Sequence, residues 1–207
     1  MSSLPKATVV RLPRYLRLLE DTATSRDTVK SSELAKAAGV NAANVRRDLS
    51  YLDFHGVRGV GYSVYQLRDR IRQELGIADR KRVAIVGAGN LGKALANYGG
   101  LGKRGFDVVA VYDSDTRKVG SGVGPVSVQG MEELTADCTD GKFDMAIVAV
   151  PDTAAQRVAN QLVDAGIQSI LNFAPVRLDV PDSVSRRQVD LSMELQVLSY
   201  YAHGPSR

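Results

Sequence analysis

Residues 82–92 combine an apolar run with three closely spaced glycines, and this feature constrains the fold more than any other. Val83 to Val86 suit a strand buried on both faces, and Gly87 to Gly92 read G-x-G-x-x-G. In that motif the first glycine permits a tight turn, the second lets backbone approach a pyrophosphate, and the third allows close helix packing. A helix from about Asn90 would direct its unpaired N–H groups at the phosphates. The pattern predicts a dinucleotide-binding site.

A second apolar run, Val108 to Tyr112, ends in Asp113, 21 residues after Gly92. In dinucleotide-binding folds an acid about 20 residues beyond the glycines accepts hydrogen bonds from the ribose hydroxyls. A carboxylate at this place disfavours the extra 2′-phosphate of NADP(H). The spacing therefore favours NAD+ and NADH as cofactors.

Strand and helix patterns continue to alternate in the C-terminal half. Phe143 to Val150 and Ser169 to Phe173 are expected to be buried strands, with a helix from Thr153 to Ala165 between them. Such alternation predicts a parallel sheet with helices on both faces, and ligands gather beyond the carboxyl ends of its strands. The candidates to line the nicotinamide side are Pro151, Asn172 and Pro175, although the prolines are equally compatible with a purely structural role in strand-to-helix turns.

The N-terminal residues predict three short helices. The first is expected from Pro13 to Asp21, because proline suits the start of a helix better than its interior. Ser31 or Ser32 is expected to cap a second helix, Glu33 to Ala38, which Gly39 ends. Asn41 then caps a third helix that runs to about Phe54. Two helices joined by residues 39–41 form a helix-turn-helix pattern.

The third helix has two dissimilar faces. Val45, Leu49 and Leu52 recur at helical spacing and would pack on the first two helices. Arg46, Arg47 and Ser50 fall on the opposite side, where arginine can bind guanine in the major groove of DNA. A solvated amphipathic helix is the alternative interpretation of the same pattern.

The segment that follows the third helix supports DNA binding. Glycines and β-branched residues from Gly56 to Tyr62 predict a tight hairpin, the wing of a winged helix, with Arg58 near its tip. A further helix is expected from Val64 to Leu75. Residues 1–80 contain 14 Lys and Arg against 9 Asp and Glu, so the basic excess of the chain lies here. Such an excess is typical of nucleic-acid-binding modules.

The C-terminal segment carries an unusually apolar helix for a terminus. Ser192 to Ala202 place leucines on one stripe and Met193, Val197 and two tyrosines on others. Such a helix requires burial on most sides, either in its own domain or in a partner subunit. The expected organisation is a winged helix-turn-helix domain over residues 1–80, a Rossmann-type domain over 81–190 and the C-terminal helix over 191–207.

Composition and the absence of targeting patterns indicate the cellular compartment of the protein. The chain has a single cysteine, Cys138, which excludes an internal disulfide and a cysteine-cluster metal site. No apolar stretch approaches the ~20 residues needed to span a bilayer, and the first residues contain no secretory signal. We therefore expect a cytoplasmic protein with no bound metal.

These motifs together resemble the redox-sensing transcriptional repressor family Rex. The resemblance rests on the order of the domains and on four segments, residues 45–51, 57–62, 86–92 and 170–175. The chain departs from the family at residues 52–56, which connect the third helix to the wing, and at Leu191, where a bulkier aromatic can occur. The resemblance covers nearly the whole chain and implies an α/β protein of two domains that is not an enzyme.

The resemblance also implies function. Members of the family are homodimers that exchange the C-terminal helix, bind a palindromic operator when NADH is scarce, and release it when NADH binds. It implies a switching set of Tyr98 near the nicotinamide, Asp190 before the exchanged helix, and Arg17 on the DNA-binding domain. The candidate DNA-binding residues are Arg46, Arg47, Ser50, Tyr51, Arg58 and Tyr62. The candidate cofactor-binding residues are Gly87, Ala88, Gly89, Asn90, Leu91, Gly92, Tyr98, Asp113, Pro151, Asn172 and Pro175.

Two other classes of protein fit parts of the pattern. An NAD-dependent dehydrogenase needs a proton donor near its substrate, and the two histidines, His55 and His203, are poorly placed for that role. A nucleotide-binding scaffold that recruits another protein would leave the basic third helix without a purpose. DNA binding that responds to NADH without substrate turnover distinguishes the three.

Overall fold

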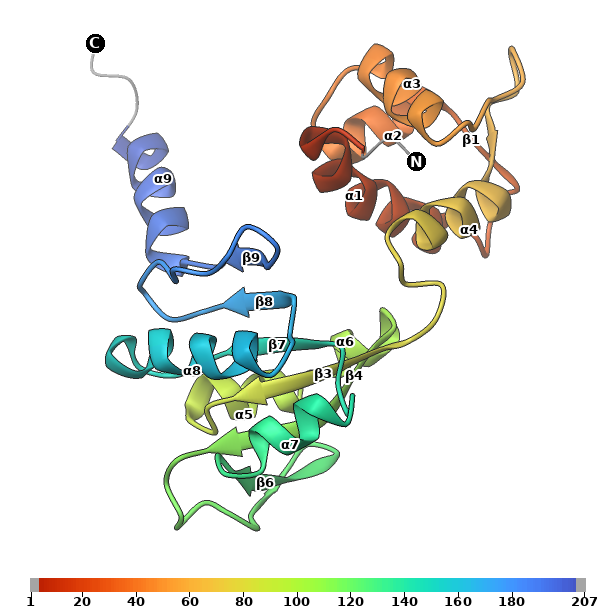
Figure 1. Ribbon diagram of the computed structural model, residues 1–207. Coiled ribbons are helices and arrows are strands. Elements are labelled where there is room, and N and C mark those ends of the chain that lie inside the picture. The colour runs from red at the N-terminus through yellow and green to blue at the C-terminus, as the bar shows by residue number, and fades with distance from the viewer. Residues whose placement is uncertain (1–3, 204–207) are drawn as a thin grey trace. The chain divides into compact units, whose positions relative to one another are not determined.

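The computed structural model describes residues 4–203, and the chain divides into two compact units, Met1–Asp79 and Arg80–Arg207. The N-terminal unit contains α1 (Lys6–Thr22), β1 (Thr28–Val29), α2 (Ser31–Ala38), α3 (Ala42–Tyr51), β2 (Tyr62–Ser63) and α4 (Val64–Glu74) (Figure 1). β1 and β2 pair in an antiparallel arrangement. Leu12, Leu16 and Leu19 of α1 are buried. Val45, Leu49 and Leu52, which were expected to pack on the first two helices, are buried as well. This is the expected winged helix-turn-helix architecture.

The first helix is longer than the sequence predicts. α1 begins at Lys6, and Pro13 lies inside it, so the predicted start at Pro13 is wrong. The Pro13 ring is exposed, and the carbonyl that loses its partner belongs to Val9, which is also exposed. Water can satisfy that carbonyl, while Thr8 and Arg11 in the first turns bond to Asp48 of α3. Tertiary contacts therefore hold the turns that proline alone would interrupt.

The other helix limits differ by a few residues. Lys30, rather than Ser31 or Ser32, precedes α2, and its backbone N–H donates to Glu33 at 2.9 Å. Gly39 ends α2 in a left-handed conformation, as expected. The Asn41 side chain caps α3 by accepting from the Asn44 N–H. α3 ends at Tyr51, three residues before the predicted Phe54, because Asp53 takes a positive φ of 52°.

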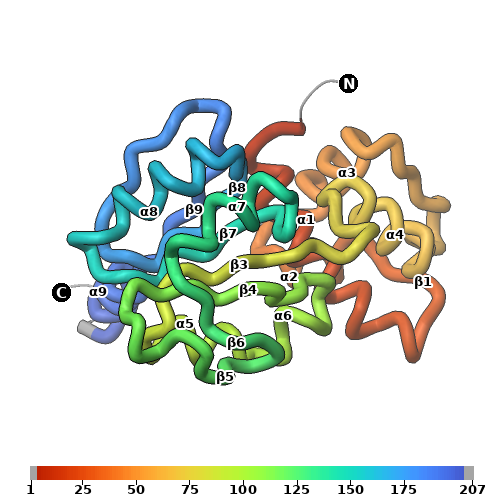
Figure 2. Tube along the Cα trace, turned by 60° about the horizontal axis from the view of Figure 1, so that its bottom comes forward, coloured from red at the N-terminus to blue at the C-terminus, as the bar shows by residue number. Residues whose placement is uncertain are grey.

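The C-terminal unit is a doubly wound sheet. Its elements are β3 (Lys81–Val86), α5 (Asn90–Ala96), α6 (Gly99–Lys103), β4 (Phe106–Asp113), β5 (Gly122–Val123), β6 (Val126–Gly130), α7 (Leu134–Thr139), β7 (Met145–Val148), α8 (Asp152–Asp164), β8 (Ser169–Asn172), β9 (Ser185–Gln188) and α9 (Leu191–His203). The strand order is β5-β6-β4-β3-β7-β8-β9, and every pairing except β5 with β6 is parallel (Figure 2).

Two apolar cores cover the two faces of this sheet. On one face Ala84 and Val86 of β3 pack with residues of α7 and α8. On the other, Val83 and Ile85 pack with Ala96 of α5. Alternate residues of one strand thus enter opposite cores, as a strand buried on both faces requires. The prediction of a parallel sheet with helices on both faces is confirmed.

α9 has no core of its own in the described chain. Its seven large apolar side chains are 54–72% exposed, from Val197 at the low end to Tyr201 at the high end. No helix within residues 4–203 is long and apolar enough to cross a membrane.

Candidate functional sites

The glycine loop after β3 is shaped by two close backbone approaches. Gly87 has φ +107°, and a Cβ there would collide with the carbonyl oxygen of Ala149 at the end of β7. A Cβ on Gly92 would collide with the Gly87 carbonyl oxygen, so α5 packs directly on the turn. A Cβ on Gly89 would meet no atom within 4 Å. Gly87 and Gly92 are therefore required by the fold. Gly89 instead leaves open space, where the pyrophosphate of a dinucleotide is expected to approach the protein backbone.

Asp113 holds this loop from the end of β4. Asp113 is buried, with only 8% of its surface exposed. Its Oδ2 accepts from the Ala88 N–H at 2.7 Å and from Lys118 Nζ at 2.8 Å. Its Oδ1 accepts from the Asp115 N–H at 2.8 Å. Burial alone would raise the pKa of Asp113, but the bonds from Lys118 and the two backbone groups outweigh it and lower that pKa. The carboxylate is therefore charged at neutral pH and able to accept from a ribose.

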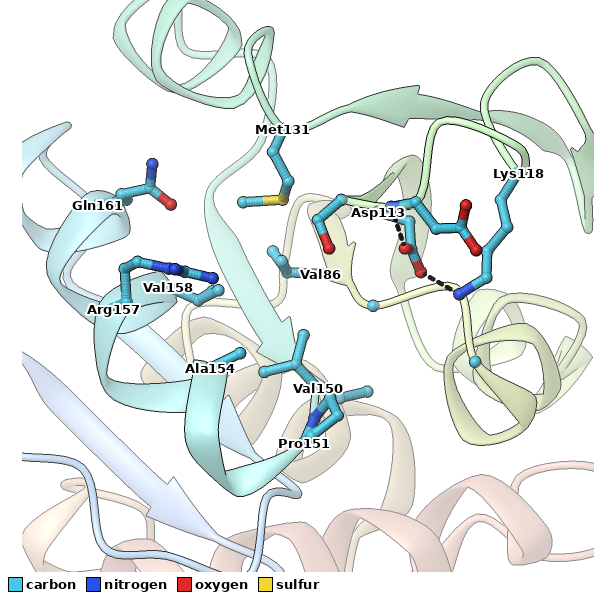
Figure 3. A pocket seen from close by; sticks show the side chains of 15 residues that line it. Val86, Asp113, Lys118, Met131, Val150, Pro151, Ala154, Arg157, Val158 and Gln161 are labelled. Atoms are coloured by element: carbon cyan, nitrogen blue, oxygen red, sulfur yellow. Dashed lines mark hydrogen bonds and ion pairs between the residues drawn. The ribbon is translucent and has the colours of Figure 1, made fainter.

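A pocket of about 500 Å³ opens beside the loop and Asp113 (Figure 3). Asp113 and Lys118 lie on one side of it, and Arg157 and Gln161 of α8 lie on the other. The volume falls in the range of small-molecule sites. The open side of Gly89, the buried carboxylate and this volume together fit a dinucleotide. Its lining is Val86, Gly87, Gly89, Asp113, Ser114, Asp115, Lys118, Met131, Ala149, Val150, Pro151, Ala154, Arg157, Val158 and Gln161.

The predicted cofactor residues are brought together only in part. Pro151 lines the pocket, whereas the other candidates for the nicotinamide side, Asn172, Pro175 and Tyr98, are not among its lining residues. Asn172 is fully buried, and its amide donates to the Val176 carbonyl and to Gln188 Oε1, each at 2.7 Å. These bonds give Asn172 a role in fixing the turn after β8. Pro175 and Tyr98 are exposed.

Sequence reasoning missed the residues on α8. Ala154, Arg157, Val158 and Gln161 recur at i, i+3, i+4 and i+7, the spacing of one helix face. That periodicity is readable in the sequence, but a helix face with two apolar and two polar residues predicts a packed helix as well as a pocket wall. Ala88, Asn90 and Leu91 belong to the loop and first turn of α5, and are not among the lining residues.

In the N-terminal unit, the basic face of α3 is free. Arg46, Arg47, Ser50 and Tyr51 are all exposed. Ser50 Oγ donates to the Arg47 carbonyl at 2.7 Å. The hairpin after α3 is closed by the Val57 and Gly61 bridge, which leaves Arg58 and Gly59 at its tip. A recognition helix and a wing with these exposed arginines suit the two grooves of DNA.

A groove of about 510 Å³ connects the wing to the start of α2, with Arg46 and Arg58 among its lining residues. Lys30, Ser31 and Ser32 also line it. The sequence predicts only a helix-capping role for Ser31 or Ser32 and none for Lys30. Tyr62 lies differently from expectation, because its ring is only 8% exposed and stacks near Phe54 with a centroid distance of 6.3 Å. Tyr62 still lines the groove, and its ring lies against Gly56 at the start of the wing.

A buried carboxylate fastens the recognition helix to α1. Asp48 is 1% exposed, and it accepts from Thr8 at 2.9 Å, from Tyr15 at 2.7 Å and from two nitrogens of Arg11 at 2.6 Å. Burial opposes the charged form, but the bonds from Arg11, Tyr15 and Thr8 lower the pKa of Asp48 overall. Because Asp48 lies next to Arg47 in the sequence, this network sets the orientation of the basic face.

The three residues of the suggested switch are placed as follows. Tyr98 precedes α6 and is 57% exposed. Asp190 precedes α9 and accepts from the backbone N–H and the hydroxyl of Ser192, at 2.9 and 2.6 Å. Those bonds lower the pKa of Asp190. Arg17 is exposed on α1 of the other unit.

A winged helix joined to a Rossmann-type unit with a dinucleotide-sized pocket defines a class, the nucleotide-responsive DNA-binding proteins. Comparison with known proteins agrees with both halves. Residues 3–50 match the family described as "Putative DNA-binding protein N-terminus", and residues 78–176 match the CoA binding domain family.

Full-length relatives identify the family. The redox-sensing transcriptional repressor Rex of Streptomyces coelicolor is 51% identical over 201 residues, which cover 96% of this chain and 77% of that protein. The Rex of Carboxydothermus hydrogenoformans is 42% identical over 198 residues and 95% of each chain. The chain belongs to the Rex family of redox-sensing transcriptional repressors, and the sequence-based resemblance is confirmed.

Solved structures agree. The repressor RSP in complex with β-NAD+ and operator DNA superposes with a TM-score of 0.90 at 36% identity, over 98% of this chain and 94% of that one. RSP in complex with β-NADH gives a TM-score of 0.86 at 36% identity, over 98% and 96% of the two chains. The named relatives are redox-sensing transcriptional repressors.

Proposed function

We propose that this chain represses transcription by binding operator DNA through its N-terminal unit and that NADH and NAD+ in the C-terminal unit control that binding. The observation that carries the proposal is the combination, in one chain, of a free basic recognition helix with a wing and of a glycine loop with a charged, buried Asp113. DNA is bound when NADH is low and released when NADH binds. A ligand shifts such an equilibrium only if its affinity differs between the two arrangements of the chain.

A dehydrogenase reaction is not favoured by any feature of the pocket. Among the described residues that line it there is no histidine, and His55 lies in the N-terminal unit beside Asp53. The proposed role of the pocket is therefore binding without turnover.

The arginines of α3 and the wing are expected to supply DNA affinity. Arg46→Ala, Arg47→Ala and Arg58→Ala should each cost about 1–3 kcal/mol where the residue reads a base. Where the residue contacts a phosphate, the slope of log affinity against log salt should fall by about one. Fluorescence anisotropy with labelled operator measures both. Arg104→Ala removes the same charge from an exposed position of the C-terminal unit and serves as control. If the triple variant binds operator as tightly as wild type, the proposed interface is wrong.

We further propose that the chain is a homodimer that exchanges α9 and reads a palindromic operator. The large apolar side chains of α9 are exposed in the single chain, so the helix requires a second surface to bury them. The sheet of the C-terminal unit offers an apolar groove of about 340 Å³, with Val83, Phe106 and Ile147 among its lining residues. A dimer would also present two recognition helices to two half-sites.

Removal of residues 190–207 tests the exchange. The truncated chain is expected to be monomeric or insoluble, because it lacks the proposed dimer contact and uncovers the groove that α9 would fill. Light scattering of the full and truncated chains at several concentrations measures the oligomeric state. A soluble truncated dimer that still responds to NADH would contradict the exchanged helix.

Tyr98, Asp190 and Arg17 remain the proposed switching set. Asp190 here bonds at the start of its own helix, to Ser192 and to the Met193 backbone, and an exchange of these local bonds for partners in another domain arrangement would form the switch. Asp190→Ala should bind NADH about as well as wild type, while NADH changes its operator affinity less. Calorimetry and anisotropy separate the two effects. An unaltered ratio of operator affinities, with and without NADH, would remove Asp190 from the switch.

A further inference from the structure

Two carboxylates, Asp113 and Asp115, are followed by two cations, Arg117 and Lys118, at the end of β4 and in the loop after it, and each cation is paired. Lys118 donates to Asp113, as described above. Arg117 is held by Asp115 through three donors: its Nε and Nη2 bond the two carboxylate oxygens at 2.9 Å each, and its backbone N–H bonds Oδ1 at 3.1 Å. The guanidinium and carboxylate thus form a bidentate pair, the geometry that fixes arginine most firmly.

Only three of these four residues line the pocket. Asp113, Asp115 and Lys118 are among its lining residues, and Arg117 is not. The Arg117 side chain is 86% exposed, whereas that of Asp115 is 27% exposed. Asp115 therefore lines the pocket, while its ion pair holds the guanidinium of Arg117 outside the pocket lining.

The distinction between NAD(H) and NADP(H) depends on this loop. NADP(H) adds a phosphate to the ribose 2′-hydroxyl, and Rossmann domains that accept it supply an arginine nearby. Arg117 is in the right segment to be that arginine, but it would first have to leave Asp115. Lys118 lines the pocket, but its ion pair with Asp113 offsets its charge. A 2′-phosphate would thus meet two carboxylates and one already paired lysine, with Arg117 outside the pocket lining.

We propose that Asp115 is a second specificity-determining residue, which excludes NADP(H) by holding Arg117 away from the ribose. The inference rests on the proposed binding of NAD(H) in this pocket. Asp115 differs from Asp113 in its partners. Asp113 also accepts from the Ala88 N–H of the glycine loop, whereas within residues 4–203 the hydrogen bonds of the Asp115 side chain come from Arg117.

The test is calorimetric titration of the full chain with NADH and with NADPH. Asp115→Asn keeps an oxygen for the Arg117 N–H and removes the charge. We expect it to bind NADPH on the order of tenfold more tightly than wild type, as a gained charge-assisted hydrogen bond implies. NADH affinity is measured in the same variant, and the expected readout is a rise in NADPH affinity relative to NADH affinity, because Asp115 itself lines the pocket. The NADPH gain should shrink at high salt, because Arg117 is exposed.

Two further variants separate the arginine from a general charge effect. Arg117→Ala alone should bind NADPH no better than wild type, and Asp115→Asn combined with Arg117→Ala should lose the gain. Unchanged NADPH affinity in Asp115→Asn, with a native circular dichroism spectrum, overturns the proposal. A gain that persists in the double variant overturns it as well, because Arg117 would then not be the cause. If wild type binds neither dinucleotide, it is the proposed function that fails.

Discussion

Replacing Asp48 by alanine is expected to destabilise the N-terminal unit by about 3–5 kcal/mol, because it leaves the partly buried Arg11 guanidinium and the buried Tyr15 hydroxyl without their shared acceptor. Denaturant unfolding followed by far-UV circular dichroism measures the change. The chain has no tryptophan, so helix content is the more convenient probe.

An exposed ion pair of the same unit provides the control. Asp69 pairs with Arg68 on α4 at 2.8 Å, and its side chain is 58% exposed. Asp69→Ala should therefore change stability by about 1 kcal/mol or less. If Asp48→Ala were as mild as Asp69→Ala, the network would not hold α3 in place.

The same network has a pH dependence of known sign. The pKa of Asp48 is lowered in the folded chain by Arg11, Tyr15 and Thr8 despite burial, so its contribution is fully present above the ordinary aspartate pKa of about 3.9. That contribution is lost as the pH falls through the lowered value. The N-terminal unit of the wild type should therefore lose stability in acid, and Asp48→Asn should show less of this loss.

Gly89→Ala is expected to abolish most NADH binding without unfolding the chain. A Cβ at this position meets no protein atom within 4 Å, and the backbone has φ −78°, which alanine adopts readily. The methyl group would instead occupy the space through which a pyrophosphate must approach. A loss of at least about tenfold, or about 1.4 kcal/mol, is expected by calorimetry.

Substitutions at two other glycines serve as controls for Gly89→Ala. Gly99→Ala also adds a methyl group where no atom lies within 4 Å, but Gly99 does not line the pocket, so NADH affinity should be unchanged. Gly92→Ala should instead lower the unfolding midpoint, because its Cβ would collide with the Gly87 carbonyl. If Gly89→Ala binds NADH like wild type, the pyrophosphate does not lie over this loop.

The sequence predicts best where local pattern and tertiary role coincide. The buried apolar run predicts β3, and the three glycines predict the turn after it. The 21-residue spacing from Gly92 predicts the acid at Asp113, where β4 ends. In contrast, β9 has the sequence Ser-Arg-Arg-Gln and forms only because β8 offers its edge, so no alternation of apolar residues marks it. α7 has six residues, too few for a helical period to be visible.

The residues of the candidate functional sites could likewise be predicted only in part. Exposed arginines on α3 could be predicted from their spacing, since the opposite stripe is apolar. The role of Asp48 could not, because its partners Thr8, Arg11 and Tyr15 lie 33–40 residues earlier in the chain. Asn172 likewise ends β8 at the ligand-binding edge of the sheet, but its amide bonds to the turn after the strand and to Gln188. Long-range partners decide such residues, and a single sequence does not contain them.

The proposal that NADH controls operator binding is tested by the operator affinity of the wild type with and without saturating NADH. Fluorescence anisotropy with a labelled duplex from the promoter of the chain's own gene is the measurement, with Gly89→Ala as the variant expected to ignore NADH. We expect the wild type to bind the operator tightly without NADH or with NAD+, and clearly more weakly when NADH is added. Operator binding by wild type that is the same in all three conditions would contradict the proposal.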